Sequence, residues 1–99
     1  MLHIVNKSPF SSPSLESCLR VVQPGSAVLL IEDGIYAATA ANPLQDRTRK
    51  SGVAIQVYAL APDVDARGMR ERIVAGVELV DYAGFVDLVT THDNVQSWL

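Results

Sequence analysis

The sequence has few of the residues from which common catalytic and metal sites are built. Its single cysteine, Cys18, excludes an internal disulfide and a metal centre made of several thiolates. The two histidines, His3 and His92, have no metal-ligand spacing between them, so we expect no bound metal. Neither a G-x-G-x-x-G nor a Walker motif occurs, and we therefore expect no nucleotide or other cofactor.

Positive charge and long apolar runs are also scarce. The formal net charge is −3, which argues against direct binding of nucleic acid. No apolar run approaches the ~20 residues of a membrane-spanning helix. The apolar start, Met1 to Val5, is too short for a secretory signal and lacks a basic flank. We expect a protein of the reducing cytoplasm that has no membrane span.

What the chain does have is the length of one domain and a surplus of apolar residues. Ninety-nine residues are enough for a single domain, residues 1–99, and for no more. The hydrophobic share is 48% and the mean hydropathy is +0.18, which is high for so small a monomer. We therefore expect other protein chains to cover part of its surface.

The central pattern is a buried strand that runs into a sharp acidic turn. Val28 to Ile31 are four consecutive apolar residues, typical of a strand buried on both faces. We expect Asp33 to cap the helix that follows and Gly34 to permit a tight turn without a Cβ clash. Ile35 to Ala41 then form a helical segment that is apolar nearly all round, which predicts cover on more than one side.

Glu32 and Asp33 at this turn are also a candidate carboxylate pair for acid–base chemistry. Adjacent side chains at the end of a strand diverge, however, and Asp33 is expected to cap the helix. A small self-sufficient enzyme that uses one of these carboxylates is therefore the least favoured of the functions considered.

Strands and helices alternate along the rest of the chain. Strands are predicted at residues 2–6, 27–31, 53–60 and 77–80. Helical segments are predicted from Ser12-Pro13, Ile35, Leu44 and Pro62, and in a last helix that is capped by Asp81 and has an inner stripe of Tyr82, Phe85, Val86 and Val89. This order predicts an α/β fold, a single three-layer domain whose mainly parallel sheet of four to five strands is flanked by helices.

Cys18 is the one soft nucleophile of the chain. On the first predicted helix it shares an apolar stripe with Leu15, Leu19 and Val22. It also lies beyond the first helical turn, where the helix dipole lowers a thiol pKa most. The position favours a small core residue over a thiolate that carries persulfide sulfur, although both roles stay open.

Four apolar residues are the candidate interface residues. Ile35 and Tyr36 belong to the helical segment that is apolar nearly all round, and Trp98 and Leu99 give the tail an apolar end. Together with the surplus of apolar residues, they predict that the chain does not remain a monomer.

Several segments taken together resemble one protein family over essentially the whole chain. They are Leu2 to Phe10, Ser14 to Leu19, Leu29 to Ala38, Val57 to Leu60 with Asp63 and Ala66-Arg67-Gly68, Val80 to Leu88, and Val95 to Leu99. In order and in length they resemble DsrH, the small subunit of the DsrEFH sulfur-transfer complex, and its relative TusB of the TusBCD sulfur relay.

The resemblance implies a DsrE/DsrF-like fold and a heterohexamer with DsrE/TusD-like and DsrF/TusC-like subunits. It implies an accessory subunit of a sulfurtransferase complex rather than a catalyst on its own. The main sulfur-carrying cysteine then belongs to the DsrE/TusD-like partner, which passes persulfide sulfur to a DsrC/TusE-type acceptor. From its place on the apolar stripe, we expect Cys18 to be at most a secondary sulfur acceptor.

The two branches of the family differ in pathway. The DsrH branch serves intracellular sulfur oxidation, and the TusB branch serves 2-thiolation of the tRNA wobble uridine. Cys18 lies where DsrH-type members carry a cysteine, so the sequence favours the DsrH branch. The alternatives are a TusB-type relay subunit and a purely structural interaction subunit in which Cys18 is inert.

Overall fold

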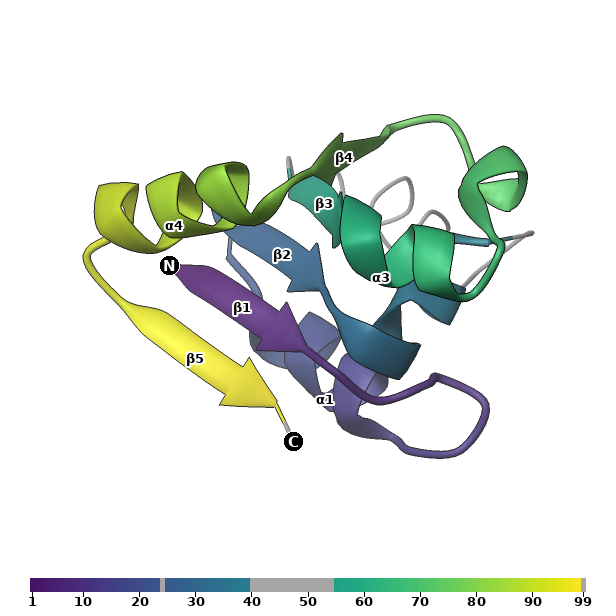
Figure 1. Cartoon of the computed structure of the whole chain (residues 1–99). Coiled ribbons are helices and arrows are strands. Elements are labelled where there is room, and N and C mark those ends of the chain that lie inside the picture. The colour runs from purple at the N-terminus through teal and green to yellow at the C-terminus, as the bar shows by residue number, and fades with distance from the viewer. Residues whose placement is uncertain (24, 40–54, 99) are drawn as a thin grey trace.

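The computed structural model describes residues 1–23, 25–39 and 55–98. Its centre is a five-stranded sheet in the order β4-β3-β2-β1-β5 (Figure 1). Every pairing in this sheet is parallel. The strands are β1 (Leu2–Val5), β2 (Ala27–Leu30), β3 (Gln56–Leu60), β4 (Val77–Val80) and β5 (Val95–Trp98).

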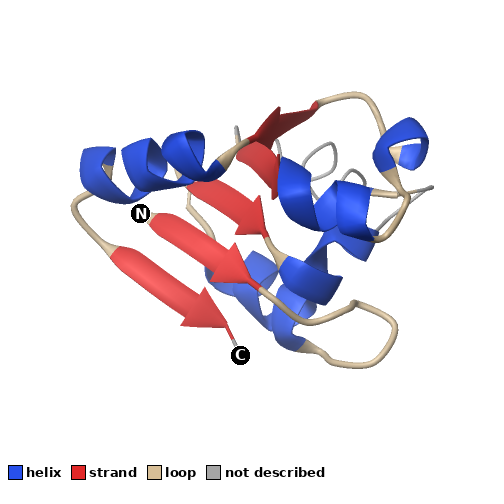
Figure 2. Cartoon of the chain, in the orientation of Figure 1, coloured by secondary structure: helices blue, strands red, loops and turns tan. Residues whose placement is uncertain are grey.

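Helical segments connect the strands and cover both faces of the sheet, α1 on one side and α4 on the other (Figure 2). They are α1 (Ser14–Val21), the 3-10 helix η1 (Glu32–Ala38), α3 (Ala61–Ala66), the short 3-10 helix η2 (Arg70–Arg72) and α4 (Tyr82–Thr91). This confirms the predicted three-layer α/β architecture. None of the helices in the described part of the chain is long and apolar enough to cross a membrane.

Alternate residues of the central strands point to two separate cores. Val28 and Leu30 of β2 pack with Leu15 and Cys18 of α1, in a core to which η1 and α3 also contribute. Leu29 points the opposite way, into a smaller core that α4 covers. Since successive side chains of a strand point to opposite faces, an unbroken apolar run is what a sheet covered on both sides needs.

The cap of α4 is confirmed, and its predicted inner stripe is wrong in part. The Asp81 carboxylate accepts a hydrogen bond from the Gly84 N–H at 2.8 Å. Phe85 and Val89 pack toward the sheet as predicted, together with Leu88. Tyr82 and Val86, however, are 62% and 57% exposed. The stripe at positions 85, 88 and 89 is the one that meets the sheet, because these positions lie on one face of a helix.

The apolar tail of the chain is a strand. β5 runs parallel to β1, with Leu2 opposite Val95 and Val5 opposite Trp98. Sequence patterning predicted only an apolar end here, because a four-residue segment has too little alternation to mark a strand. The pairing with β1 is a tertiary contact, and it makes β5 one edge of the sheet (Figure 1).

Other boundaries differ modestly from those predicted. The helix expected from Ile35 begins three residues earlier, at Glu32, and is a 3-10 helix. The third strand begins at Gln56, and residues 53–54 of the predicted strand lie outside the described residues, as do the predicted helix at 44–50 and Leu99. α3 ends before Gly68, whose φ of 64° suits the expected glycine stop.

Candidate functional site

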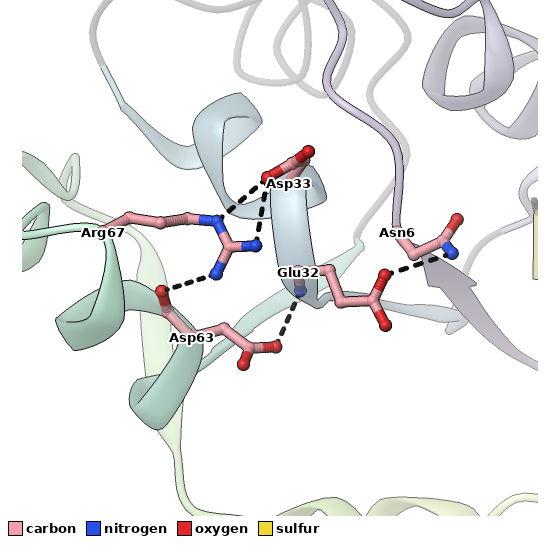
Figure 3. A network of polar contacts seen from close by, with 5 residues as sticks. All are labelled: Asn6, Glu32, Asp33, Asp63 and Arg67. Atoms are coloured by element: carbon pink, nitrogen blue, oxygen red, sulfur yellow. Dashed lines mark hydrogen bonds and ion pairs between the residues drawn. The ribbon is translucent and has the colours of Figure 1, made fainter.

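The acidic turn lies where the carboxyl ends of β1, β2 and β3 meet. Glu32 and Asp33 begin η1 immediately after β2, Asn6 follows β1, and Asp63 and Arg67 come from the segment after β3 (Figure 3). Ligand sites of open α/β sheets gather at such an edge, which makes this network the first candidate site.

Asp33 does not cap the helix, contrary to the expectation from sequence. Its Oδ1 atom accepts a hydrogen bond from Arg67 Nε at 3.1 Å and lies 3.0 Å from Arg67 Nη2. A cap residue must precede the helix, whereas Asp33 lies inside η1, and its carboxylate is turned toward α3 (Figure 3). The free N–H at the start of η1 is instead satisfied from outside, because Glu32 N donates to Asp63 Oδ2 at 2.7 Å.

Gly34 is required at the turn because a side chain there would clash, as predicted. The residue with positive φ is Glu32, at 49°, and not Gly34. A Cβ atom on Gly34 would collide with the backbone carbonyl of Val5, at the end of β1. Gly34 therefore permits a close approach of two backbones rather than a left-handed turn.

The geometry of this network does not form an acid–base pair. The Asp33 carboxylate is engaged by Arg67, and the Glu32 carboxylate accepts from Asn6 Nδ2 at 3.5 Å on the opposite side (Figure 3). Arg67 also donates from Nη1 to the Asp63 backbone oxygen at 3.2 Å. The two carboxylates thus diverge as predicted, so they do not point at one shared reacting atom. Their contacts instead hold β1, η1 and α3 together.

Cys18 lies in the interior of the larger core. Its side chain has no exposed surface, and it packs with Leu15 and Leu19 of α1. Burial raises the pKa of the Cys18 thiol to about 11, because a thiolate loses its hydration there. The population of thiolate, the form that accepts or attacks sulfur, is therefore very small near neutral pH.

The candidate interface residues occupy different environments. Ile35 has no exposed surface and belongs to the chain's own core, so it is not available as a contact for another chain, contrary to expectation. Tyr36 is half-buried beside a shallow surface pocket of ≈ 480 Å³ that it lines with Thr39, Met69 and Arg72. Trp98 is also half-buried and packs against the larger core.

The largest exposed apolar side chains are ones that sequence reasoning did not choose. Phe10, in the loop after β1, is 85% exposed, and Tyr82 and Val86 of α4 are also exposed. Val95 of the edge strand β5 is exposed in the same way. The position of Phe10 between proline and serine residues marks a surface loop and was the one available signal for it.

The fold and this edge define a small α/β protein with a parallel sheet, in which the carboxylates of Glu32, Asp33 and Asp63 hold neighbouring segments together. Comparison with protein families extends this conclusion. The model of the family described as DsrH like protein matches residues 7–95. The curated protein TusB of Pectobacterium parmentieri is 40% identical over 98 residues, covering 99% of this chain and 100% of that protein. TusB of Escherichia coli K12 is 35% identical with the same coverage. The chain belongs to the DsrH/TusB family.

Solved structures show the same fold at lower sequence identity. The ychN protein of Escherichia coli superposes with a TM-score of 0.74 at 18% identity, over 97% of each chain. The protein MTH1491 of Methanobacterium thermoautotrophicum superposes with a TM-score of 0.70 at 16% identity, over 97% of this chain and 95% of that one. These likenesses bear on the fold alone and agree with the predicted DsrE-like architecture.

Proposed function

We propose that this chain is the TusB-type subunit of a cytoplasmic sulfur-relay complex that serves 2-thiolation of the tRNA wobble uridine. The observation that carries the proposal is the 35–40% identity to proteins named TusB over the whole length of both chains. In this proposal the chain supports sulfur transfer by its sister subunits and does not catalyse a reaction alone.

The proposed partners are a DsrE/TusD-like subunit and a DsrF/TusC-like subunit, assembled with this chain in a heterohexamer. Exposed apolar side chains support an assembly of this kind, because burying them against a partner chain removes apolar surface from water and stabilises the complex. Tyr82 and Val86 on α4, Val95 on β5 and Phe10 are the side chains that a partner would cover. The sulfur acceptor in this proposal is a DsrC/TusE-type protein.

The burial of Cys18 supports an accessory role. A sulfur carrier must expose its sulfur to another protein's persulfide and must hold a thiolate near neutral pH. Cys18 has no exposed surface, and its pKa is raised to about 11. The carrier cysteine is accordingly assigned to the DsrE/TusD-like partner.

Sulfur oxidation through a DsrEFH-type complex is the second candidate. Its one support is the cysteine at position 18, whereas the curated relatives favour the TusB branch. Because Cys18 is fully buried, it gives little support to a function in which its sulfur takes part.

A complementation experiment tests the proposal. Cells that lack their own TusB receive this chain together with the TusC-like and TusD-like subunits of the same genome, and tRNA 2-thiouridine is measured by mass spectrometry. We expect 2-thiouridine to return when all three subunits are present. A complex that assembles with the relay acceptor present and leaves tRNA without 2-thiouridine would contradict the proposal.

A matched pair of variants then tests the proposed contact surface. Val86→Asp places a charge on the exposed apolar side of α4, and Thr90→Asp places the same charge one turn later at an exposed polar position. We expect Val86→Asp to reduce co-purification of the sister subunits and Thr90→Asp to leave it unchanged. Equal retention of the partners by both variants would exclude this side of α4 as the contact surface.

A further inference from the structure

His3 and Trp98 join the two ends of the chain by one side-chain hydrogen bond. The indole Nε1–H of Trp98 on β5 donates to His3 Nδ1 on β1 at 3.1 Å. The two rings are tilted by 36°, with centroids 6.1 Å apart. His3 is only 2% exposed, so this bond lies in a site largely closed to water, where a lost partner is not simply replaced by solvent.

The strand that this bond holds has few other attachments. β5 is an edge strand and pairs with β1 alone. Val95, Gln96 and Ser97 are all exposed, and only Trp98 of this strand packs against the core. The stability of β5 therefore depends on its backbone pairing with β1 and on the anchoring of Trp98.

We propose that His3 and Trp98 form a proton-sensitive latch, which fastens β5 to β1 while His3 is neutral and releases it when His3 is protonated. An indole nitrogen can only donate a hydrogen bond, so His3 Nδ1 must be an unprotonated acceptor. Protonation places a hydrogen on Nδ1, so the acceptor is lost. The new N–H of His3 and the indole N–H of Trp98 then point at each other and repel. Release of β5 lets the imidazolium reach water and frees the outer edge of β1.

Among the described residues, none beside His3 offers a charge that stabilises its protonated form. The cavity beside it, ≈ 350 Å³, is also lined by Met1, Val21, Gln23, Gly25, Ser26 and Asn94. These residues include no carboxylate, and the Met1 ammonium is a like charge. On β2 and β5 the residues opposite His3 are the neutral Val28 and Gln96.

The helix that covers this side of the sheet does not supply a counter-charge either. On α1, Glu16 and Arg20 form an exposed ion pair with each other at 3.7 Å, and Cys18 is a buried neutral thiol. Burial, and to a smaller degree the Met1 ammonium, lower the pKa of His3 below 6.5. The open, solvated form thus binds a proton more readily than the latched form. The latch contributes most stability above pH 6.5, and that contribution falls as the pH drops below this value.

Hydrogen exchange and fluorescence of the full-length chain test the latch. Trp98 is the only tryptophan, so its emission wavelength reports its own burial directly. Between about pH 7.5 and about pH 5.5, on either side of the ordinary histidine pKa, we expect a red shift of the emission. Over the same range we expect amide protection at residues 95–98 to fall relative to β2, after correction for intrinsic exchange, by up to about tenfold, the limit for release of a single histidine.

Three variants separate the latch from other titrations. His3→Asn keeps an oxygen acceptor near the position of Nδ1 but does not titrate, so the transition should vanish while β5 stays protected. His92→Asn removes the other histidine and should leave the transition unchanged. Trp98→Phe removes the donor and should lower the protection of residues 95–98 at both pH values.

A measurement on the unaltered chain tests the latch even if one of the variants fails to fold. The ring nitrogens of His3, followed by NMR, should titrate over the same pH range as the loss of protection at β5. A β5 whose protection is independent of pH, or a transition that follows His92 and not His3, would overturn the proposal.

Discussion

The Asp63 carboxylate accepts a hydrogen bond from the backbone N–H of Glu32 at 2.7 Å. The residue that caps η1 therefore comes from α3, which lies after the next strand, and not from the turn itself. Glu32 has a φ of 49°, a conformation that is costly for any residue except glycine, so an external bond at this position helps to hold it.

The first prediction concerns this external cap. Asp63→Ala removes the acceptor and leaves the first N–H of η1 without its partner. We expect a loss of about 1 kcal/mol in the free energy of unfolding, the usual effect of losing a helix cap. Urea denaturation followed by circular dichroism measures this loss.

Two further variants serve as controls for that measurement. Asp63→Asn retains a side-chain oxygen and should cost less than Asp63→Ala. Asp33→Ala removes the ion pair with Arg67. Because the Asp33 carboxylate is largely exposed, we expect the free energy of unfolding to fall by only about 0.2–1 kcal/mol. If Asp33→Ala is the more destabilising of the two alanine variants, then Asp33 and not Asp63 is the main residue that stabilises the turn.

The second prediction concerns Gly34. Gly34→Ala places a Cβ atom against the Val5 carbonyl, and because that atom belongs to the backbone of a central strand it cannot move cheaply. We expect a loss of about 3 kcal/mol, at the upper end of ordinary overpacking.

Gly84→Ala is the matched control for this substitution. Its Cβ atom would lie 3.0 Å from Val80 Cβ and would meet only side-chain atoms nearby. Since alanine also favours a helix interior, we expect a change within about 1 kcal/mol of zero. Similar midpoints of thermal unfolding for the two variants would show that β1 and η1 do not approach each other as described.

The third prediction concerns the Cys18 thiol. The pKa is raised by burial from 9.0 to about 11, so at neutral pH the folded chain holds about 100-fold less thiolate than the unfolded chain. We expect alkylation of the folded chain to be slower by at least that factor, as measured by mass spectrometry with and without denaturant.

The same raised pKa makes stability depend on pH. The folded state keeps the Cys18 proton up to about pH 11, whereas the unfolded state releases it near 9.0. The stabilising difference is complete below pH 9.0 and is lost as the pH rises above it. Cys18→Ala should lack this component of the alkaline loss, and an identical alkaline profile for both proteins would show that the thiol is not desolvated.

Much of the fold could be predicted because its strands are local patterns. β1, β2 and β4 are short apolar runs bounded by turn residues, and Asp81 precedes an amphipathic segment, so each was placed within about a residue. β5 was missed because Val95–Trp98 becomes a strand only through its pairing with β1.

The contacts of the turn could not be predicted, because they join segments that are distant in the sequence. Glycine at position 34 was correctly predicted to avoid a Cβ clash, but the atom that it would meet, the Val5 carbonyl, belongs to a segment distant in the sequence. Asp33 has the side chain of a cap residue, yet Arg67, 34 positions away, engages it. The exposure of Tyr82 and Val86 likewise depends on which face of α4 meets the sheet.

The most direct test of the account is the mass of each subunit in the assembled relay complex after brief loading with a persulfide donor. Its central claim is that this chain supports sulfur transfer without carrying the sulfur, because Cys18 is enclosed in the core. We predict a one-sulfur gain on the DsrE/TusD-like partner, no comparable gain on this chain, and unchanged transfer in the Cys18→Ala complex. A one-sulfur gain on this chain as fast as on the partner, or transfer abolished by Cys18→Ala in an intact complex, would contradict the claim.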